Sequence, residues 1–320
     1  MPITKDVFIE AQPTDSASLL TRFKPHIRNI LHIPVLSHLL PFARRVEAVS
    51  EPVGRLSVQP VPASVRNTDD RTITIISANL WHDWPKHRNF MTRLESFSGM
   101  VRDENADVVL LQEVSRRTDF HVDRWLSERL GMAHVYSRAN GHEAGIGFEE
   151  GLAVLSRFPI QSLYLQQLGS RANIFVHRLA MGARVLSPWG SFAAISVHLG
   201  ILKSHNTRQI AHLYTWINSV LGGLPGIIGG DFNTHENTPR MTRLRFTWLD
   251  TFRSMHPDAD GTTHELCTSQ GKVLRRSRLD YIFLRHGKAT WKVLETRHLD
   301  GRNGPHSDHR AVLTRLLLTA

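Results

Sequence analysis

The stretch GIIGGDFN (residues 226–233) joins a short apolar strand to a polar turn. Ile227 and Ile228 are β-branched residues typical of a buried strand, and the glycine pair that follows ends the apolar run. Asp231 and Asn233 therefore stand just beyond a strand, where a rigid sheet can hold side chains over a cleft. An aspartate in this position is also common as a cap of the following turn, so this stretch alone does not indicate a functional site.

The same arrangement recurs along the chain, with a polar side chain at the end or the start of an apolar strand. Besides Asp231 and Asn233, the residues in this position are Asn79, Glu113, His198, Asp280, Asp308 and His309. Each one alone has an ordinary structural explanation, because Asn and Asp form turns readily. One pattern repeated in a consistent order favours a single shared site.

Strands and helices alternate irregularly from residue 71 onward. Amphipathic periodicity predicts helices over 88–104, 121–130 and 207–221. Runs of β-branched and apolar residues predict strands over 72–78, 107–111, 152–155, 174–181, 192–197, 226–228, 279–284, 291–296 and 311–318. Because these strands do not follow a strict βαβ repeat, we expect an α/β sandwich built on two sheets.

The composition points to an acidic partner. The chain has 320 residues, with 39 Lys+Arg against 29 Asp+Glu and a formal net charge of +10, which fits nucleic acid, anionic lipid or a phosphorylated substrate. Cys267 is the single cysteine, which excludes an internal disulfide and a cysteine-based zinc site. No stretch approaches the ~20 apolar residues that span a bilayer. The first residues lack the features of a secretory signal, so a cytoplasmic protein is expected.

Residues 1–70 differ from the rest and are predicted to form an N-terminal extension to a principal domain over 71–320. The extension holds 8 Lys+Arg and 7 Asp+Glu, so nearly all the surplus charge belongs to the principal domain. Residues 53–70 have the composition of a linker. Residues 20–46 mix basic and apolar side chains without an acid. They are either a surface for an anionic membrane or short helices that pack on the domain, and packing is favoured.

Seven short motifs carry a family resemblance. They are SANLW (77–81), LLQEV (110–114), GLAVLSRFPI (151–160), SVHLG (196–200), GGDFNT (229–234), SRLDYIF (277–283) and HSDHRAV (306–312). In this order, over about residues 72–318, they resemble the endonuclease/exonuclease/phosphatase superfamily. The resemblance implies a four-layer α/β sandwich, in which two mixed β-sheets pack face to face with flanking helices. It also implies a phosphodiester hydrolase that depends on Mg²⁺, with Mn²⁺ as a substitute.

The resemblance further implies a metal-binding set. Glu113 would be the main ligand, with Asn79 and Asp308 as the others, and the metal would stabilise charge on the phosphate and the leaving oxygen. Some relatives carry an acid two residues after the asparagine, where this chain has Trp81. Asp83 is near enough to replace that acid, although a turn role is favoured.

The remaining motif residues take catalytic roles by the same resemblance. Asp231 would orient or deprotonate the attacking water, and Asn233 would donate its amide N–H to water or phosphate. His309, oriented by Asp280, would contact the phosphate from one side and His198 from the other. Many relatives carry an arginine in the helix after His198, in a register that here holds asparagine (position 206). Arg208 is adjacent, so this departure bears on one expected phosphate contact and not on the reaction class.

Three functions compete for this site. A nuclease is favoured by a basic cluster, expected on a loop at the cleft mouth, where Arg275, Arg276 and Arg278 would grip backbone phosphates; a merely solvated basic face is the alternative. A sphingomyelinase-like or phosphoinositide phosphatase-like hydrolase of lipid head groups is the second function. An inactive binding protein of the same fold is the third. Nucleic acid is the expected partner, and an anionic membrane bound through residues 20–46 is the alternative.

Overall fold

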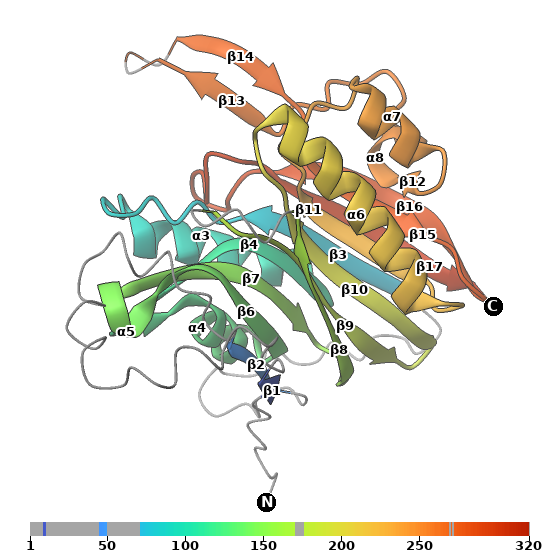
Figure 1. Cartoon of the computed structure of the whole chain (residues 1–320), viewed down its shortest axis with the longest axis horizontal. Coiled ribbons are helices and arrows are strands. Elements are labelled where there is room, and N and C mark those ends of the chain that lie inside the picture. The colour runs from blue at the N-terminus through green and yellow to red at the C-terminus, as the bar shows by residue number, and fades with distance from the viewer. Residues whose placement is uncertain are drawn as a thin grey trace, which may run out of the picture.

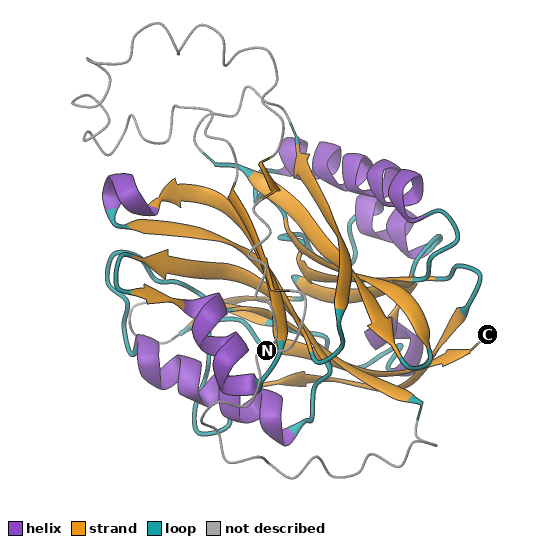
Figure 2. Ribbon diagram, turned by 90° about the horizontal axis from the view of Figure 1, so that it is seen from below, coloured by secondary structure: helices purple, strands orange, loops and turns teal. Residues whose placement is uncertain are grey.

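Two β-sheets pack face to face with helices on their outer sides (Figures 1 and 2). This computed structural model describes residues 9–10, 45–49, 71–169, 176–268, 270 and 272–319. The arrangement confirms the expected four-layer α/β sandwich. None of the described helices is long and apolar enough to cross a membrane.

The first sheet has nine strands and mixes parallel with antiparallel pairs. β3 and β4 run parallel, and the other neighbours run antiparallel. The strand order is β1 (Ile9–Glu10), β2 (Arg45–Val49), β6 (Ala133–His142), β7 (Phe148–Ser156), β4 (Val108–Arg117), β3 (Thr72–Asn79), β17 (Ala311–Thr319) and β16 (Thr290–Leu299), with β5 (Phe120–His121) paired to β4.

The second sheet has six strands, and a separate hairpin projects from the body of the protein (Figure 1). Within the six-stranded sheet, β10 and β11 run parallel and the other pairs run antiparallel. The order is β12 (Leu249–Asp250), β15 (Asp280–Arg285), β11 (Gly226–Asp231), β10 (Gly190–His198), β9 (Arg178–Ser187) and β8 (Ile160–Leu168); the hairpin is β13 (His264–Cys267) with β14 (Val273–Ser277).

Three apolar cores hold the layers together. The central core lies between the sheets and includes Ile75 of β3 and Phe192 of β10. Ile76, the next residue of β3, belongs instead to the core beneath the outer helices, because successive side chains of a strand point to opposite faces. The helices are α3 (Phe90–Asp103) and α4 (Val122–Leu130) over the first sheet, α6 (Lys203–Leu221) and α7 (Pro239–Arg245) over the second, and the short α5 (Glu143–Ile146) and α8 (Thr251–Met255).

The predicted elements agree with the structure best where strands are fully buried. The sequence missed β6 and β8, and the predicted strand over 174–181 is in fact β9, which begins at Arg178. The extension is not wholly separate, because β2 pairs with β6, so residue 70 does not mark where the sheet begins. Apart from the backbone of residues 45 and 46, the proposed membrane segment 20–46 lies outside the described residues.

The glycine pair identified at the outset lets strands approach closely at the end of β11. A Cβ atom on Gly230 would lie 1.9 Å from the carbonyl oxygen of Val197, on the neighbouring strand β10. Backbone cannot move aside as a flexible side chain can, so this position accepts no side chain without separating the strands that end in His198 and Asp231.

Gly230→Ala is therefore expected to lower the free energy of unfolding by more than the ~1–2 kcal/mol that a left-handed backbone alone costs a side chain. Gly131→Ala is the control, because Gly131 has a left-handed backbone, with φ 63° and ψ 43°, and nothing lies within 4 Å of its added Cβ. Urea denaturation measures both values. Equal losses in the two variants would contradict the close approach.

Candidate active site

Three polar residues form a row across the second sheet. His198 at the end of β10 pairs with Asp231 at the end of β11, which pairs with Asp280 at the start of β15. All three are at least 95% buried. The row places an imidazole and two carboxylates side by side at one edge of the sheet.

The first sheet presents Glu113 through a distortion of β4. The pairing of β4 with β7 shifts register between Leu111 and Val114, and Glu113 has a φ of 52°. Such a bulge turns a side chain out of the regular alternation. The Glu113 carboxylate then accepts hydrogen bonds from the Asn79 amide, at 3.1 Å, and from the backbone N–H of His82, at 3.2 Å.

Asn79 links the two sheets at this edge. Its Nδ2 also lies 3.3 Å from the Asp231 carboxylate, while its Oδ1 accepts the backbone N–H of Trp81 at 2.9 Å. Glu113 and Asp231, 118 positions apart in the sequence, are thus held by one amide group. The buried Gln112 side chain donates to the hydroxyl of Ser196 at 2.9 Å and makes a second cross-sheet contact.

Asp231 is oriented by the turn that follows it. Asn233, with a φ of 49°, donates its backbone N–H to one carboxylate oxygen at 2.7 Å and its side-chain amide to the other at 3.1 Å. Burial raises the pKa of Asp231 to about 7, the nearby negative charges of Asp280 and Glu113 add to the rise, and positive His309 opposes it. A carboxyl group with this pKa exchanges a proton readily near neutral pH.

His309 and Asp280 form a buried ion pair. The His309 Nδ1 lies 2.8 Å from a carboxylate oxygen of Asp280. Burial by itself would lower the pKa of His309, but the charge and hydrogen bond of Asp280 outweigh it and raise this pKa to about 10. The imidazole is therefore positively charged at neutral pH, with Nε2–H free to donate to an anion.

His198 has the opposite character because Arg178 lies beside it. Burial and then the positive charge of Arg178 bring the pKa of His198 well below its usual range, so this imidazole stays neutral. Arg178, on β9, places a guanidinium nitrogen 3.0 Å from His198 Nδ1. The sequence reasoning missed this arginine, and no local signal marks it, since only the pairing of β9 with β10 brings it to the site. Asn206, in the register expected for an arginine, is buried and binds backbone carbonyls instead.

Oxygen donors at this edge fit a hard divalent cation. Glu113 and Asp231 converge on Asn79, and the second carboxylate oxygen of Asp280 is buried without a hydrogen-bond partner among the described residues. Two groups bring polar atoms within 4.8 Å of one another: Asp231, Asp280 and His309, and His264, Asp308 and His309; because His309 is protonated, the carboxylates are the ligands that these groups offer. Carboxylate and amide oxygens are the ligands that Mg²⁺ and Mn²⁺ prefer. The predicted roles of Glu113, Asn79 and Asp308 in holding a metal remain predictions.

Arg278 does not face a substrate, so this part of the sequence prediction was wrong. Its side chain is 1% exposed and forms ion pairs with Asp250, at 2.6 Å, and Glu236, at 3.1 Å. Arg275 and Arg276 are exposed as expected, but they lie on strand β14 and not on a loop. Asp83 bonds to Arg88 at 2.9 Å in the turn before α3, which supports the turn role over a metal role.

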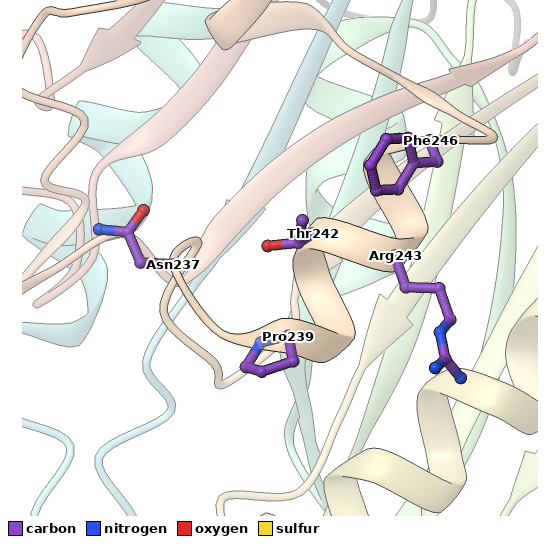
Figure 3. Close-up of a pocket in the computed structure, with 5 residues that line it drawn as sticks. All are labelled: Asn237, Pro239, Thr242, Arg243 and Phe246. Carbon is purple, nitrogen blue, oxygen red and sulfur yellow. The ribbon is translucent and has the colours of Figure 1, made fainter.

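Two surface hollows differ in whether residues of the candidate site line them. A hollow of about 270 Å³ is lined by Glu113, His198 and Arg178 together with Trp84 and Phe148, so it opens directly beside the candidate site. A larger hollow, of about 450 Å³, lies on α7 and the segments flanking it, and contains none of the motif residues singled out above (Figure 3).

Arg278→Ala is expected to destabilise the fold by roughly 3–5 kcal/mol, because the buried Asp250 carboxylate loses its ion-pair partner, whereas Glu236 keeps Arg253. Arg276→Ala is the matched control on the same segment and should change the free energy of unfolding by less than about 0.5 kcal/mol. Urea denaturation of both proteins checks the difference. Two equally mild variants would mean that Arg278 is not buried as described.

Asp280→Asn is expected to bring the pKa of His309 down from about 10, because the amide removes the negative charge that holds the imidazole protonated. An NMR titration of the His309 ring in metal-free protein measures this pKa directly. Asp119→Asn, on an exposed turn, serves as control and should leave it unchanged. An unaltered His309 pKa in Asp280→Asn would refute the ion pair.

Comparison with known proteins places these features in a family. A model of the Endonuclease/Exonuclease/phosphatase family matches residues 76–309. The uncharacterized protein YbhP of Escherichia coli (strain K12) is 30% identical over 146 residues, which cover 42% of this chain and 56% of YbhP. The match thus spans about half the length of this relative.

Solved structures show the same fold. A family protein from Leptotrichia buccalis C-1013-b has a TM-score of 0.63 and 18% identity, over 76% of this chain and 99% of that one. D. rerio TDP2 in complex with a single-strand DNA product has a TM-score of 0.61 and 18% identity, over 77% and 99%. Family membership supports a hydrolase that acts on phosphate esters. Since the family model runs from strand β3 to His309, this chain belongs to the Endonuclease/Exonuclease/phosphatase family.

Proposed function

We propose that this protein is a divalent-metal-dependent phosphodiester hydrolase. The observation that carries the proposal is the junction at Asn79, where a metal-type carboxylate, Glu113, and a base-type carboxylate, Asp231, meet within one hydrogen-bonded group. A cationic His309 lies near Asp231, and the positive charge of His309 favours the approach of an anionic ester. The combination suits attack of water on a negatively charged ester.

Each side chain of the candidate site has a separate role in hydrolysis. Asp231, fixed by Asn233, holds the attacking water and accepts its proton, because its pKa of about 7 suits both states. His309, fixed by Asp280, donates a hydrogen bond to a phosphate oxygen and offsets charge that develops there. Neutral His198 and the guanidinium of Arg178, which lie 3.0 Å apart on the second sheet, would contact the phosphate from that side. A bound divalent cation, held by Glu113, would withdraw charge from the phosphate and stabilise the leaving oxygen.

Nucleic acid is the first substrate class of the proposal. Exposed Arg275 and Arg276 lie on the hairpin next to the site, where they would hold backbone phosphates in a sequence-independent way. The solved relative TDP2 carries a single-strand DNA product, which makes this substrate class a reasonable one to test on the shared fold.

A lipid phosphodiester is the second substrate class, and one observation favours it. Large aliphatic side chains are exposed on the same hairpin and on the loop after His198. Exposed aliphatic groups do not help to bind a polyanion in water, whereas they do help to bind a lipid surface.

Asp231→Ala and His309→Ala are each expected to lower hydrolysis of the soluble diester bis(p-nitrophenyl) phosphate by roughly 10²–10⁴-fold, the usual contribution of a positioned acid or base. Removal of divalent metal with a chelator should abolish turnover, and Mg²⁺ or Mn²⁺ should restore it. Asp119→Ala is the control and should be fully active.

Circular dichroism of each variant shows whether the fold is intact. Wild-type activity in Asp231→Ala would mean that the water-activating residue is misassigned. A wild-type protein that hydrolyses no phosphodiester with either metal would end the proposal.

A further inference from the structure

The edge of the second sheet that carries the candidate site also carries two exposed apolar segments. One is the loop that leaves β10 just after His198, where Ile201 is 73% and Leu202 66% exposed. The other is the β13–β14 hairpin that leads into Asp280, where Leu266 is 51% and Leu274 61% exposed. Because His198 and Asp280 lie in one row with Asp231, both segments start from the same edge as the site.

The hairpin presents apolar groups on both of its faces. Leu266 lies opposite Arg275 on one face, whereas Val273 lies opposite Cys267, the next residue of β13, and so belongs to the other face; the register shift leaves Leu274 between these two pairs. Neither strand pairs with either large sheet, so the hairpin stands alone in solvent (Figure 1). A two-stranded ribbon with exposed apolar side chains on both faces suits insertion into a lipid surface, and not packing of one face on a flat partner.

The base of the hairpin is fixed relative to the site. The Thr263 hydroxyl accepts the backbone N–H groups of Leu279 and Asp280, at 2.9 and 3.1 Å, and the Thr263 carbonyl accepts that of Arg310 at 2.7 Å. The rings of His264 and His309 lie in contact, with centroids 4.6 Å apart. Whatever the hairpin binds is therefore held in a defined position relative to His309.

Positive charge surrounds the apolar groups. Lys203 follows Leu202, and Lys272, Arg275 and Arg276 accompany the hairpin leucines, all of them exposed. Against these four cations, the two segments 199–203 and 264–277 contain one acid, Glu265, which is paired with Arg276. The surface is thus both aliphatic and basic.

An anionic lipid bilayer fits this surface better than nucleic acid does. Proteins hold single-stranded nucleic acid with basic and aromatic side chains, on which the bases stack. The exposed groups here are leucine, isoleucine and valine, which gain free energy in the boundary between head groups and acyl chains, while nearby Lys and Arg pair with lipid phosphates.

We propose that Ile201, Leu202, Leu266, Val273 and Leu274, here called the aliphatic rim, dock the protein on an anionic membrane. Docking turns the edge with His198, Asp231 and Asp280 toward the head groups, so the substrate is a phospholipid head-group phosphodiester. This inference rests on the proposed hydrolase function and decides between its two substrate classes.

The test is binding of the full chain to sedimented vesicles of phosphatidylglycerol and phosphatidylcholine, in parallel with hydrolysis of bis(p-nitrophenyl) phosphate. Leu266→Ser/Leu274→Ser and Ile201→Ser/Leu202→Ser are each expected to weaken vesicle binding by about tenfold or more, because each removes two inserted side chains. Hydrolysis of the soluble diester should stay within about twofold of wild type, because the aliphatic rim contacts the membrane and not the phosphodiester bond.

The control is Val220→Ser/Leu294→Ser, which removes two exposed aliphatic groups elsewhere. Val220 lies near the far end of α6, about 27 Å along the helix from Leu202. This variant should bind vesicles like wild type. Vesicles of phosphatidylcholine alone should bind wild type more weakly, because the basic groups then lack an anionic partner.

Several results would overturn the inference. Wild type that does not sediment with anionic vesicles would do so, as would rim variants that bind as tightly as wild type. Weakened binding of a single-stranded oligonucleotide by the rim variants, with vesicle binding unchanged, would assign the rim to nucleic acid. Vesicle binding without hydrolysis of any diester would instead refute the hydrolase proposal while leaving the docking surface in place.

Discussion

The structure depends on one constraint: two sheets must pack closely enough for side chains from both to share hydrogen bonds at one edge. The Asn79 amide, between Glu113 and Asp231, is the contact in which this constraint is met. Apolar residues such as Ile75 and Phe192 fill the space behind it. Buried Asp231 and half-buried Glu113 on facing sheets are tolerable because hydrogen-bond donors surround them, from Asn79, Asn233 and the His82 backbone.

Electrostatics within the site follows from what each buried group has beside it. Two imidazoles lie within one cluster, yet His309 is held charged by Asp280 and His198 is held neutral by burial and Arg178. Burial and the charge of Asp280 raise the pKa of Asp231 and the charge of His309 lowers it, so that this pKa is about 7. One small volume therefore offers a cation, a neutral acceptor and a proton-exchanging carboxyl group, which matches the different demands of binding an anion and activating water.

Sequence patterns predicted the fold class and gathered the polar strand-end residues, because each stands at the end or the start of a buried apolar run that is easy to recognise. They failed where a residue's surroundings come from distant strands. Arg278 looked like a member of an exposed basic cluster, but Asp250 and Glu236, far away in the sequence, bury and neutralise it. Arg178 had no signal at all, since its neighbour His198 is supplied by strand pairing. The exposed strand β14 lacks the apolar run by which strands are recognised.

The hydrogen bonds of Thr263 bear on which part of the hairpin can vary in sequence during evolution. Among the described residues, the bonds that tie the hairpin to the segments of Asp280 and His309 lie at or below the level of Ser277, on the side of the body of the protein. None of the described residues beyond that level, toward the tip, donates or accepts a hydrogen bond with Asp280 or His309. The length and the side chains of the outer hairpin can therefore change from one descendant to another while the arrangement of Asp280 and His309 is kept.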